Sequence, residues 1–366
     1  MPTKHNSTRH WLRAAAAAAA VSIAWSVATP AGENGELMKA IVYHTYGLAD
    51  VLRLEETAKP VPGDNQVLVK VRAASVNPLD WHYMRGTPYV MRLAGTGLRK
   101  PNDPRMGVDV AGEVETVGRN VTQFKPGDAV FGTGAGAFSE YVAASENRLV
   151  LKPENISFEQ AAAVPVAALT ALQGLRDQGR IQPGQKVLIN GASGGVGTFA
   201  VQIAKSFGAE VTGVCSTRNV ELVRSLGADR VIDYTQDDFT KGDQRYDLIL
   251  DNVGNRSLSA IRRVMNPKGI YVLVGGGGPD DGRWLGPLAR GIKTLMLSPF
   301  VSQDLVMFMA TINKDDLTTL KELMETNRVT PVLDRTYPLR ETATAIRYLE
   351  EGRARGKVII TMEQDD

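Results

Sequence analysis

One glycine-rich segment constrains the fold of this chain more than any other feature. It spans residues 190–197 and reads Asn-Gly-Ala-Ser-Gly-Gly-Val-Gly, with an apolar stretch before it and a predicted helix after it that ends at Gly208. Glycines at such a place allow a tight turn and let the backbone approach a pyrophosphate, which the N–H groups of a helix N-terminus attract. The segment therefore predicts a dinucleotide-binding strand, loop and helix. The alternative is a turn between strand and helix that binds no ligand.

Predicted strands and helices alternate around this loop. The strands are expected at 186–190, 210–215, 231–233, 248–251 and 270–274, and the helices at 197–207, 219–226 and 257–265. Such alternation specifies a parallel sheet with helices on both faces. An Ala-rich helix over 157–174, interrupted at Pro165, is expected just before it. We therefore predict an α/β fold whose cofactor domain covers residues 161–302.

The residues on either side of this domain have a different pattern. From Met38 to about Val150, short apolar runs are separated by turn signals such as Pro62-Gly63-Asp64, and we find no long helical period. A compact β-rich domain is expected over 38–160. Residues 303–366 contain predicted helices at 315–326 and 341–351 and one strand at 357–361. A chain that ends in a single strand is expected to return to the β-rich domain.

The N-terminal residues 1–37 are excluded from the fold. Basic residues precede an apolar run at 14–27, and Ser26-Val27-Ala28 offers small residues, which is the layout of a secretory signal. Two interpretations stay open: export, with Met1–Ala28 as the signal peptide, or a translation start at Met38 with upstream residues wrongly included. We favour the second and a cytoplasmic location, because the cofactor inferred below belongs to a cytosolic pool.

The composition excludes several classes of protein. The 42 Lys and Arg residues nearly balance the 40 Asp and Glu residues, which argues against nucleic-acid binding through overall charge. The single cysteine, Cys215, excludes an internal disulfide and a zinc site made of several thiolates. We interpret Cys215 as a packing residue, because no histidine lies near it in the sequence.

The residues after the second predicted strand indicate which dinucleotide binds. A site for NAD carries an acidic residue there, which bonds the ribose 2′-hydroxyl. This chain has Val-Cys-Ser-Thr-Arg at 214–218, with no acid. The Ser216 hydroxyl and the Arg218 guanidinium suit a 2′-phosphate, so we predict NADPH as the cofactor. The alternative is that Arg218 is a solvated surface charge.

The chain also resembles a known family. Residues fall at the spacing of the quinone oxidoreductase/ζ-crystallin signature at Gly184-Gln185, Leu188, Ala192-Ser193-Gly194-Gly195, Gly197, Gln202 and Lys205. Matching stretches at 75–80, 107–112 and 352–358 extend the likeness over nearly everything from Met38 onward. The chain is similar to the zinc-independent branch of the medium-chain dehydrogenase/reductase superfamily, which includes reticulon-4-interacting-protein-like and plastid-envelope quinone reductases.

This resemblance implies a GroES-like substrate domain, a Rossmann cofactor domain, a cleft between them, and homodimers. It also implies the residues that contact NADPH, from the phosphate loop through the 2′-phosphate pocket and the nicotinamide half to a C-terminal stretch that closes on the cofactor. In that order they are Ser193, Gly194, Gly195 and Val196; Ser216, Arg218 and Tyr234; Thr170, Asn252 and Gly275; and Arg355, Gly356 and Lys357. The alternative for Arg355 and Lys357 is plain C-terminal charge.

Zinc-dependent members of the superfamily carry ligands that this chain lacks. They have a cysteine near the position of Asn77 and Gly-His-Glu where this chain has Gly107-Val108-Asp109. The resemblance therefore implies that no metal is bound. Without zinc, hydrogen-bond donors must stabilise the negative charge that develops on the substrate oxygen.

Candidate donors cluster at residues 77–83, which replace the zinc-ligand region. Tyr83 is a candidate through its phenolic proton, His82 as an imidazolium, and Asn77 belongs to the same segment. The alternatives are that Tyr83 is a half-buried strand residue and His82 a surface imidazole. Asp80 is expected to form a structural ion pair with Arg85.

Three functions remain open from the sequence. The first is a zinc-independent NADPH reductase that transfers hydride to quinones or α,β-unsaturated carbonyls, which are small-molecule electrophiles. The second is a zinc-free alcohol or aldehyde dehydrogenase. The third is a non-catalytic NADPH-binding protein whose role is partner binding. The complete loop favours catalysis.

Overall fold

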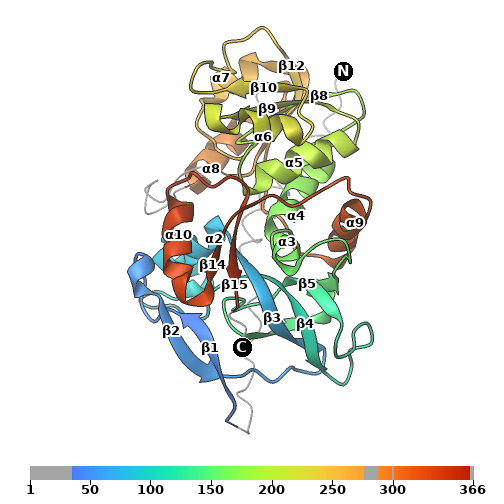
Figure 1. Ribbon diagram of the computed structural model, residues 1–366. Helices are drawn as coiled ribbons and strands as arrows, with labels where there is room; N and C mark the ends of the chain where they lie inside the picture. Colours follow the sequence, from blue (N-terminus) through green and yellow to red (C-terminus); the bar gives the residue numbers. More distant parts are fainter. Residues whose placement is uncertain (1–34, 276–286, 299–300, 363–366) are drawn as a thin grey trace, which may run out of the picture.

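The computed structural model describes residues 35–275, 287–298 and 301–362. Nearly all of the predicted N-terminal extension lies outside the described residues, although strand β1 already begins at Leu37, one residue before the expected start. Figure 1 shows a sheet flanked by helices at one end of the molecule and a second group of strands at the other. No described helix combines the length and the apolar character that crossing a membrane requires.

A six-stranded parallel sheet follows the glycine-rich segment. Its strands are β8 (Lys186–Asn190), β9 (Glu210–Cys215), β10 (Arg230–Asp233), β11 (Tyr246–Asp251), β12 (Met265–Leu273) and β13 (Asp304–Met307). They are ordered β10-β9-β8-β11-β12-β13, and every neighbouring pair is parallel. The strand order reverses at β8 and β11, which is where doubly wound sheets bind dinucleotides. The predicted alternation is confirmed.

Helices connect these strands and cover both faces of the sheet. They are α4 (Pro165–Gln173), α5 (Gly195–Ser206), α6 (Val220–Ser225), α7 (Leu258–Arg263) and α8 (Pro287–Leu297). The predicted interruption at Pro165 is also confirmed, because the short helix α3 (Phe158–Ala162) ends before it and α4 begins at it. Proline suits the first turn of a helix, where its missing N–H has no intrahelical partner to lose.

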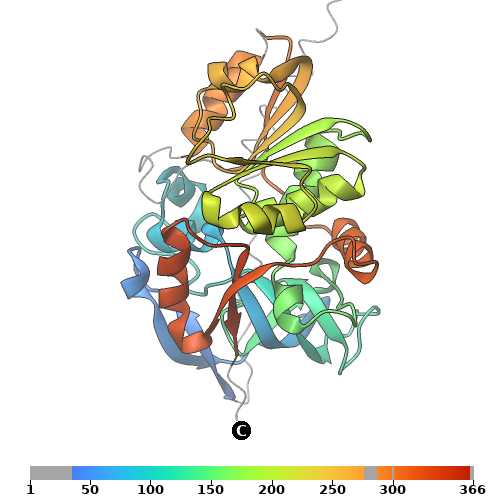
Figure 2. The same cartoon turned by 45° about the horizontal axis from the view of Figure 1, so that its top comes forward.

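The other strands form a mainly antiparallel sheet and a separate two-stranded ribbon. The sheet contains β3 (Gln66–Val76), β4 (Asp109–Val117), β5 (Ala129–Thr133), β6 (Tyr141–Ser145), β7 (Leu149–Leu151), β14 (Leu333–Pro338) and β15 (Lys357–Thr361), and the ribbon pairs β1 (Leu37–Val42) with β2 (Arg53–Ala58). The last strand returns to the β-rich part as predicted: β15 pairs antiparallel with β3, with Val358 opposite Val76. Helices α9 (Lys314–Glu325) and α10 (Thr342–Glu350) precede β15 in the chain. Figure 2 shows the two helices on opposite sides of the molecule.

Residues 38–150 are β-rich as predicted, but they hold one short helix that the sequence analysis did not place. Helix α2 (Pro78–Arg85) follows β3 and buries Trp81, Tyr83 and Met84. It is short and only weakly amphipathic, so its period does not stand out in the sequence. The signal that could have found it is local: Asn77 precedes a proline at the first helical position, and Asp80 stands where a capping carboxylate is expected.

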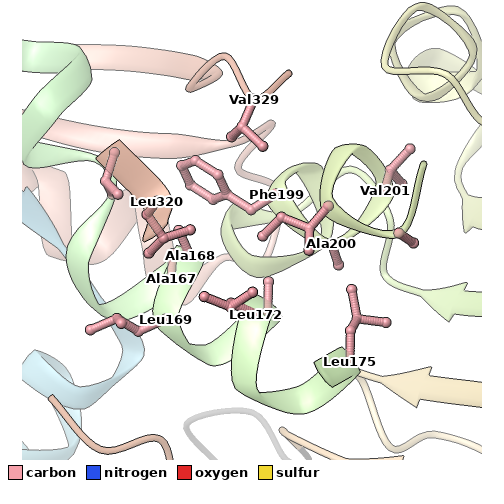
Figure 3. Close-up of a cluster of buried hydrophobic side chains, with 14 of the residues drawn as sticks. Ala167, Ala168, Leu169, Leu172, Leu175, Phe199, Ala200, Val201, Leu320 and Val329 are labelled. Carbon is pink, nitrogen blue, oxygen red and sulfur yellow. The ribbon is translucent and has the colours of Figure 1, made fainter. Parts of the chain in front are cut away.

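A continuous apolar core joins the two sheets through helix α4. Leu169, Leu172 and Leu175 pack with Phe199 of α5 and Leu320 of α9, as Figure 3 shows. The same cluster extends to Ala111 and Phe131 in the antiparallel sheet and to Val187 and Ile189 in the parallel sheet. Helix α4 is therefore held from both sides, and its first turn contacts β4 through the hydrogen bond from the Val166 N–H to Asp109.

Candidate active site

The phosphate loop has the geometry that its glycines predict. Gly191 adopts a φ of +78°, and a Cβ on Gly197 would lie 2.0 Å from the Gly191 carbonyl oxygen, so helix α5 can begin here only without a side chain at 197. Gly194 is different: its φ of −85° and ψ of 179° suit any residue, and the nearest atom to an added Cβ is the Gly191 oxygen at 3.5 Å. No protein atom therefore demands glycine at 194, in contrast to Gly197, and its lack of a side chain leaves the loop backbone open, as pyrophosphate binding requires.

The end of β9 lies beside this loop. Ser216 follows the strand and Asn219 closes the 3₁₀ turn Thr217–Asn219. Asn219 is buried, and its side-chain Nδ2 donates to Ser193 Oγ at 2.9 Å and to Ser216 Oγ at 3.3 Å. The structure therefore brings the predicted Ser193 and Ser216 together through a residue that sequence reasoning missed. Asparagine is common just before a helix, where it caps the helix, so the position of Asn219 in the sequence did not indicate a part in a binding site.

Arg218 and Tyr234 border the same site at its exposed rim. The Arg218 guanidinium donates to the Arg353 carbonyl at 2.6 Å, and the Tyr234 side chain is 53% exposed. An acid that the sequence reasoning did not weigh, Asp233, ends the neighbouring strand β10. Its carboxylate accepts from the Thr217 hydroxyl at 2.5 Å, a bond that is the main cause of its lowered pKa. Asp233 is thus bound to Thr217, the residue that follows Ser216 in the chain.

The C-terminal stretch reaches the loop through its backbone. The Gly356 N–H donates to the Ser193 carbonyl at 2.9 Å, and the Arg355 N–H donates to Asp334 at 2.9 Å. Lys357 continues beneath the loop, with its Cδ 3.1 Å from where a Cβ on Gly195 would lie. The alternative that Lys357 is plain surface charge is wrong, because the residue is 3% exposed.

The residues predicted for the nicotinamide half lie at the ends of neighbouring strands and on α4. Asn252 donates from Nδ2 to the Asn190 carbonyl at 3.0 Å, and its buried Oδ1 has no hydrogen-bond partner among the described residues. Gly275 lies against it, since an added Cβ would be 2.6 Å from the Asn252 carbonyl. The half-buried Thr170 hydroxyl donates to the Val166 carbonyl at 2.7 Å. An unsatisfied buried amide oxygen at this switch point fits a ligand that donates hydrogen bonds.

A buried polar network joins the antiparallel sheet to helix α4 next to these residues. The Lys357 ammonium donates to Asn77 Oδ1 at 2.6 Å and to the Val76 carbonyl at 3.2 Å, and lies 3.5 Å from Asp109 Oδ2. Asn77 Nδ2 in turn donates to Asp109 Oδ2 at 2.9 Å, and Asp109 Oδ1 accepts the Val166 N–H at 3.0 Å. Burial lowers the pKa of Lys357, and the nearby Asp109 opposes that shift. The network connects the phosphate loop to the start of α4.

This network uses the polar atoms of Asn77. Its oxygen accepts from Lys357, its nitrogen donates to Asp109 and more weakly to the Ser75 carbonyl at 3.4 Å, and the residue is 2% exposed. An amide nitrogen has two hydrogens, so both are engaged. The polar atoms of Asn77 are therefore engaged within the protein, and no donor is left for a substrate.

His82 is also poorly placed as a proton donor. Its Nδ1 lies 2.8 Å from the Thr87 carbonyl, which can only accept, so Nδ1 carries the hydrogen. Burial is the main cause of the lowered pKa of His82, which favours the neutral ring. The Nε2 of that tautomer accepts rather than donates. Tyr83, on the same helix, is 9% exposed, and the alternative that it belongs to a strand is wrong.

The expected ion pair between Asp80 and Arg85 is wrong. Arg85 instead pairs with Glu350 of α10 at 2.7 Å, because α10 packs against α2. Asp80 is buried, and its Oδ2 accepts the Asn77 N–H at 2.7 Å at the start of the helix. Burial raises the pKa of Asp80 to about 7, with the Asp109 carboxylate adding to the effect and the Asn77 bond opposing it.

This shift predicts how stability depends on pH. Because the folded protein holds the Asp80 proton more tightly than the unfolded chain, Asp80 stabilises the fold most below about pH 4, and that contribution is lost as the pH rises to about 7. Asp80→Asn keeps an acceptor without the charge. We compare the unfolding free energy of the wild type with that of this variant from pH 5 to pH 8. As long as the pH is below the folded pKa, the difference should fall by about 1.4 kcal/mol for each unit that the pH rises. Urea titrations of both proteins at each pH measure the difference in unfolding free energy. A difference that does not change with pH would contradict the raised pKa of Asp80.

Within the described part of the chain, no group of three or more His, Cys, Asp or Glu side chains is arranged to hold a metal ion. The position expected of a zinc-binding cysteine is taken by Asn77, whose neighbours are Asp109 and Lys357. Cys215 is buried in the core, where burial raises the pKa of its thiol to about 11, in agreement with a packing residue.

Comparison with known proteins gives the family. Residues 63–154 match the alcohol dehydrogenase GroES-like domain, and residues 226–360 match the family described as zinc-binding dehydrogenase. The 2-methylene-furan-3-one reductase of Solanum lycopersicum is 35% identical over 362 residues, which covers 95% of this chain and 84% of that protein. The chloroplastic NADPH-dependent alkenal/one oxidoreductase of Arabidopsis thaliana is 35% identical over 368 residues, which covers 96% and 86%.

A solved structure agrees with these relatives. The quinone oxidoreductase from Coxiella burnetii superposes with a TM-score of 0.78 at 31% identity, over 90% of this chain and all of that chain. A GroES-like domain beside a Rossmann domain, with a phosphate loop at the switch point, defines an oxidoreductase of the medium-chain type. The chain belongs to the medium-chain dehydrogenase/reductase superfamily, in its quinone oxidoreductase branch.

Proposed function

We propose that this protein is an NADPH-dependent reductase that transfers hydride to a quinone or to an α,β-unsaturated carbonyl compound. The observation that carries the proposal is the glycine-rich loop at the switch point of the parallel sheet, where an added Cβ on Gly194 would meet only the Gly191 oxygen, at 3.5 Å, so that glycine leaves the loop backbone open to a pyrophosphate. The names of the relatives support the acceptor class, since they include an alkenal/one oxidoreductase and a quinone oxidoreductase.

The nicotinamide, when bound, supplies the hydride. The part of this chain is to bind the dinucleotide, hold the acceptor against it and exclude water. Residues at the loop and the end of β9 bind its phosphates, and residues at the ends of β11 and β12 and on α4 hold the nicotinamide half. These are Ser193, Gly194, Gly195, Val196, Ser216, Arg218, Tyr234, Thr170, Asn252 and Gly275, with Gly356 closing on the loop through its backbone.

Tyr83 is the donor that we propose for the acceptor oxygen. Asn77 has no unused hydrogen and His82 presents an accepting nitrogen, whereas the phenol of Tyr83, on the same helix as His82, carries a proton that it can donate. A phenol holds its proton through the neutral pH range and can donate a hydrogen bond to an oxyanion without prior protonation.

Four further features belong to the proposal. The reaction proceeds without zinc, the protein forms homodimers, and it acts in the cytoplasm, although its relatives include chloroplastic and mitochondrial proteins by name. The substrate domain covers 38–160 and 303–366, and the cofactor domain covers 161–302. Strand β13 at 304–307 belongs to the parallel sheet, so the second boundary is better placed after it.

The proposal is tested by following NADPH oxidation by the purified full chain. The acceptors are an ortho-quinone, a para-quinone, an enone, an aldehyde and a blank, each with NADPH and with NADH. We expect turnover with a quinone or the enone and a preference for NADPH. Alcohol-dependent reduction of NADP⁺ with no enone or quinone activity would favour the alcohol dehydrogenase alternative. Binding of NADPH without turnover on any acceptor would favour the binding protein.

A further inference from the structure

The side-chain amide of Asn219 lies between two hydroxyl groups of the proposed cofactor site. Ser193 belongs to the phosphate loop after β8, and Ser216 follows β9, so the two serines come from neighbouring parallel strands. Asn219 Nδ2 donates to both hydroxyl oxygens, at 2.9 and 3.3 Å. Its backbone N–H also donates to the Ser216 carbonyl at 2.9 Å, which fixes the turn. The buried amide thus holds both half-buried hydroxyls in place.

The direction of these hydrogen bonds determines what the serines can do. An amide nitrogen only donates, so Ser193 Oγ and Ser216 Oγ both act as acceptors toward Asn219. Each hydroxyl therefore keeps its own hydrogen for another acceptor. In the part of the chain that the structure describes, neither hydroxyl makes a further hydrogen bond. Two donors are left at the end of β9, where the ribose of a dinucleotide lies in this type of sheet.

We propose that Asn219 sets the preference for NADPH by making Ser193 and Ser216 donors toward the 2′-phosphate. This inference rests on the proposed function and deepens it. A phosphomonoester dianion only accepts, and its three terminal oxygens can take both hydroxyl hydrogens and the Arg218 guanidinium. The 2′-hydroxyl of NADH is a single neutral group and gains much less from two donors and a cation. Asn219 touches neither the substrate nor the reacting atoms, so it is a positioning residue.

The orientation of the Asn219 amide decides which way these hydrogen bonds run. Its Oδ1 is buried and accepts no hydrogen bond among the described residues, while Nδ2 is used twice. If the amide were reversed, the oxygen would accept both serine hydrogens and the hydroxyls would be acceptors toward a phosphate that cannot donate. Binding of NADPH therefore requires the orientation in which the amide nitrogen faces the two serines.

The test uses Asn219→Asp, which has the same shape but two accepting oxygens. The serine hydrogens should then turn toward the new carboxylate, and the 2′-phosphate should lose both donors. We expect the dissociation constant of NADPH to rise by about tenfold or more, since hydrogen bonds to charged groups are the strong ones, and that of NADH to change little. Fluorescence titration of the full chain with each dinucleotide gives the ratio of the two constants. An unchanged ratio would overturn the inference.

A double-mutant cycle separates hydrogen-bond direction from the added charge. Ser216→Ala alone should weaken NADPH binding, and it should cost less in the Asn219→Asp background, where the hydroxyl no longer donates outward. A charge effect alone would make the two changes additive, which would contradict the proposal.

A second variant, Asn219→Leu, adds no charge. It should also lower the preference for NADPH, and it replaces Asn219→Asp in the test if the Asp variant does not fold. If the wild type bound NADPH and NADH equally, the proposed cofactor itself would be wrong. If the wild type preferred NADPH and the variants kept that preference, only this inference would be wrong.

Discussion

Replacing Lys357 by Met is expected to lower the free energy of unfolding by about 3–5 kcal/mol. The ammonium is buried and lies against Asn77, the Val76 carbonyl and Asp109. Removing it leaves the fully buried Asp109 carboxylate without its cation, and an uncompensated buried charge is far more costly than a lost surface pair. Urea or guanidinium unfolding of the variant beside the wild type measures the loss.

Two further variants show whether the buried charge is the cause. Lys321→Met removes the lysine of a solvent-accessible pair with Glu325 on α9, and we expect it to cost less than about 1 kcal/mol. Adding Asp109→Asn to Lys357→Met should recover part of the stability, because neither partner then remains charged and buried alone. A loss for Lys357→Met no greater than for Lys321→Met would show that the ammonium does not compensate Asp109.

The second large effect is expected at Gly194. Gly194→Ala should raise the dissociation constant of NADPH by about 100-fold, equivalent to about 2.7 kcal/mol, while stability changes by less than about 1 kcal/mol. The reason is that the backbone of Gly194 suits alanine and the added Cβ would meet only the Gly191 oxygen, at 3.5 Å. The methyl group would instead occupy the space where a pyrophosphate approaches the loop. Fluorescence titration and thermal unfolding measure the two quantities.

Other glycines provide matched controls for this variant. Gly242→Ala, where an added Cβ meets nothing within 4 Å, should change neither binding nor stability. Gly197→Ala should reduce both, by about 1–3 kcal/mol in stability, since its Cβ would lie 2.0 Å from the Gly191 oxygen. Wild-type affinity for NADPH in a folded Gly194→Ala protein would show that the loop does not carry the pyrophosphate, and would remove the observation on which the proposed function rests.

The parallel sheet and its loop could be predicted because their signals are local. Strands such as β8 and β9 are buried on both faces and therefore appear as short continuous apolar runs, and the glycines between β8 and α5 mark the turn. Helix α2 could not be found by its period, since eight residues with a weak apolar face resemble an irregular segment. The predicted pairing of Asp80 with Arg85 failed because Arg85 faces α10, whose Glu350 lies 265 positions later in the chain.

The sequence by itself determined the fold class, the place of the glycine-rich loop and the residue types at the end of β9, because each depends on neighbours within a few positions. Tertiary structure alone decided what the polar groups do there. Lys357 reaches Asn77 across 280 positions because β15 pairs antiparallel with β3, and that contact engages the amide that the sequence offered as a donor. Asn219 reaches Ser193 because β8 and β9 are parallel neighbours whose carboxyl ends meet at one edge.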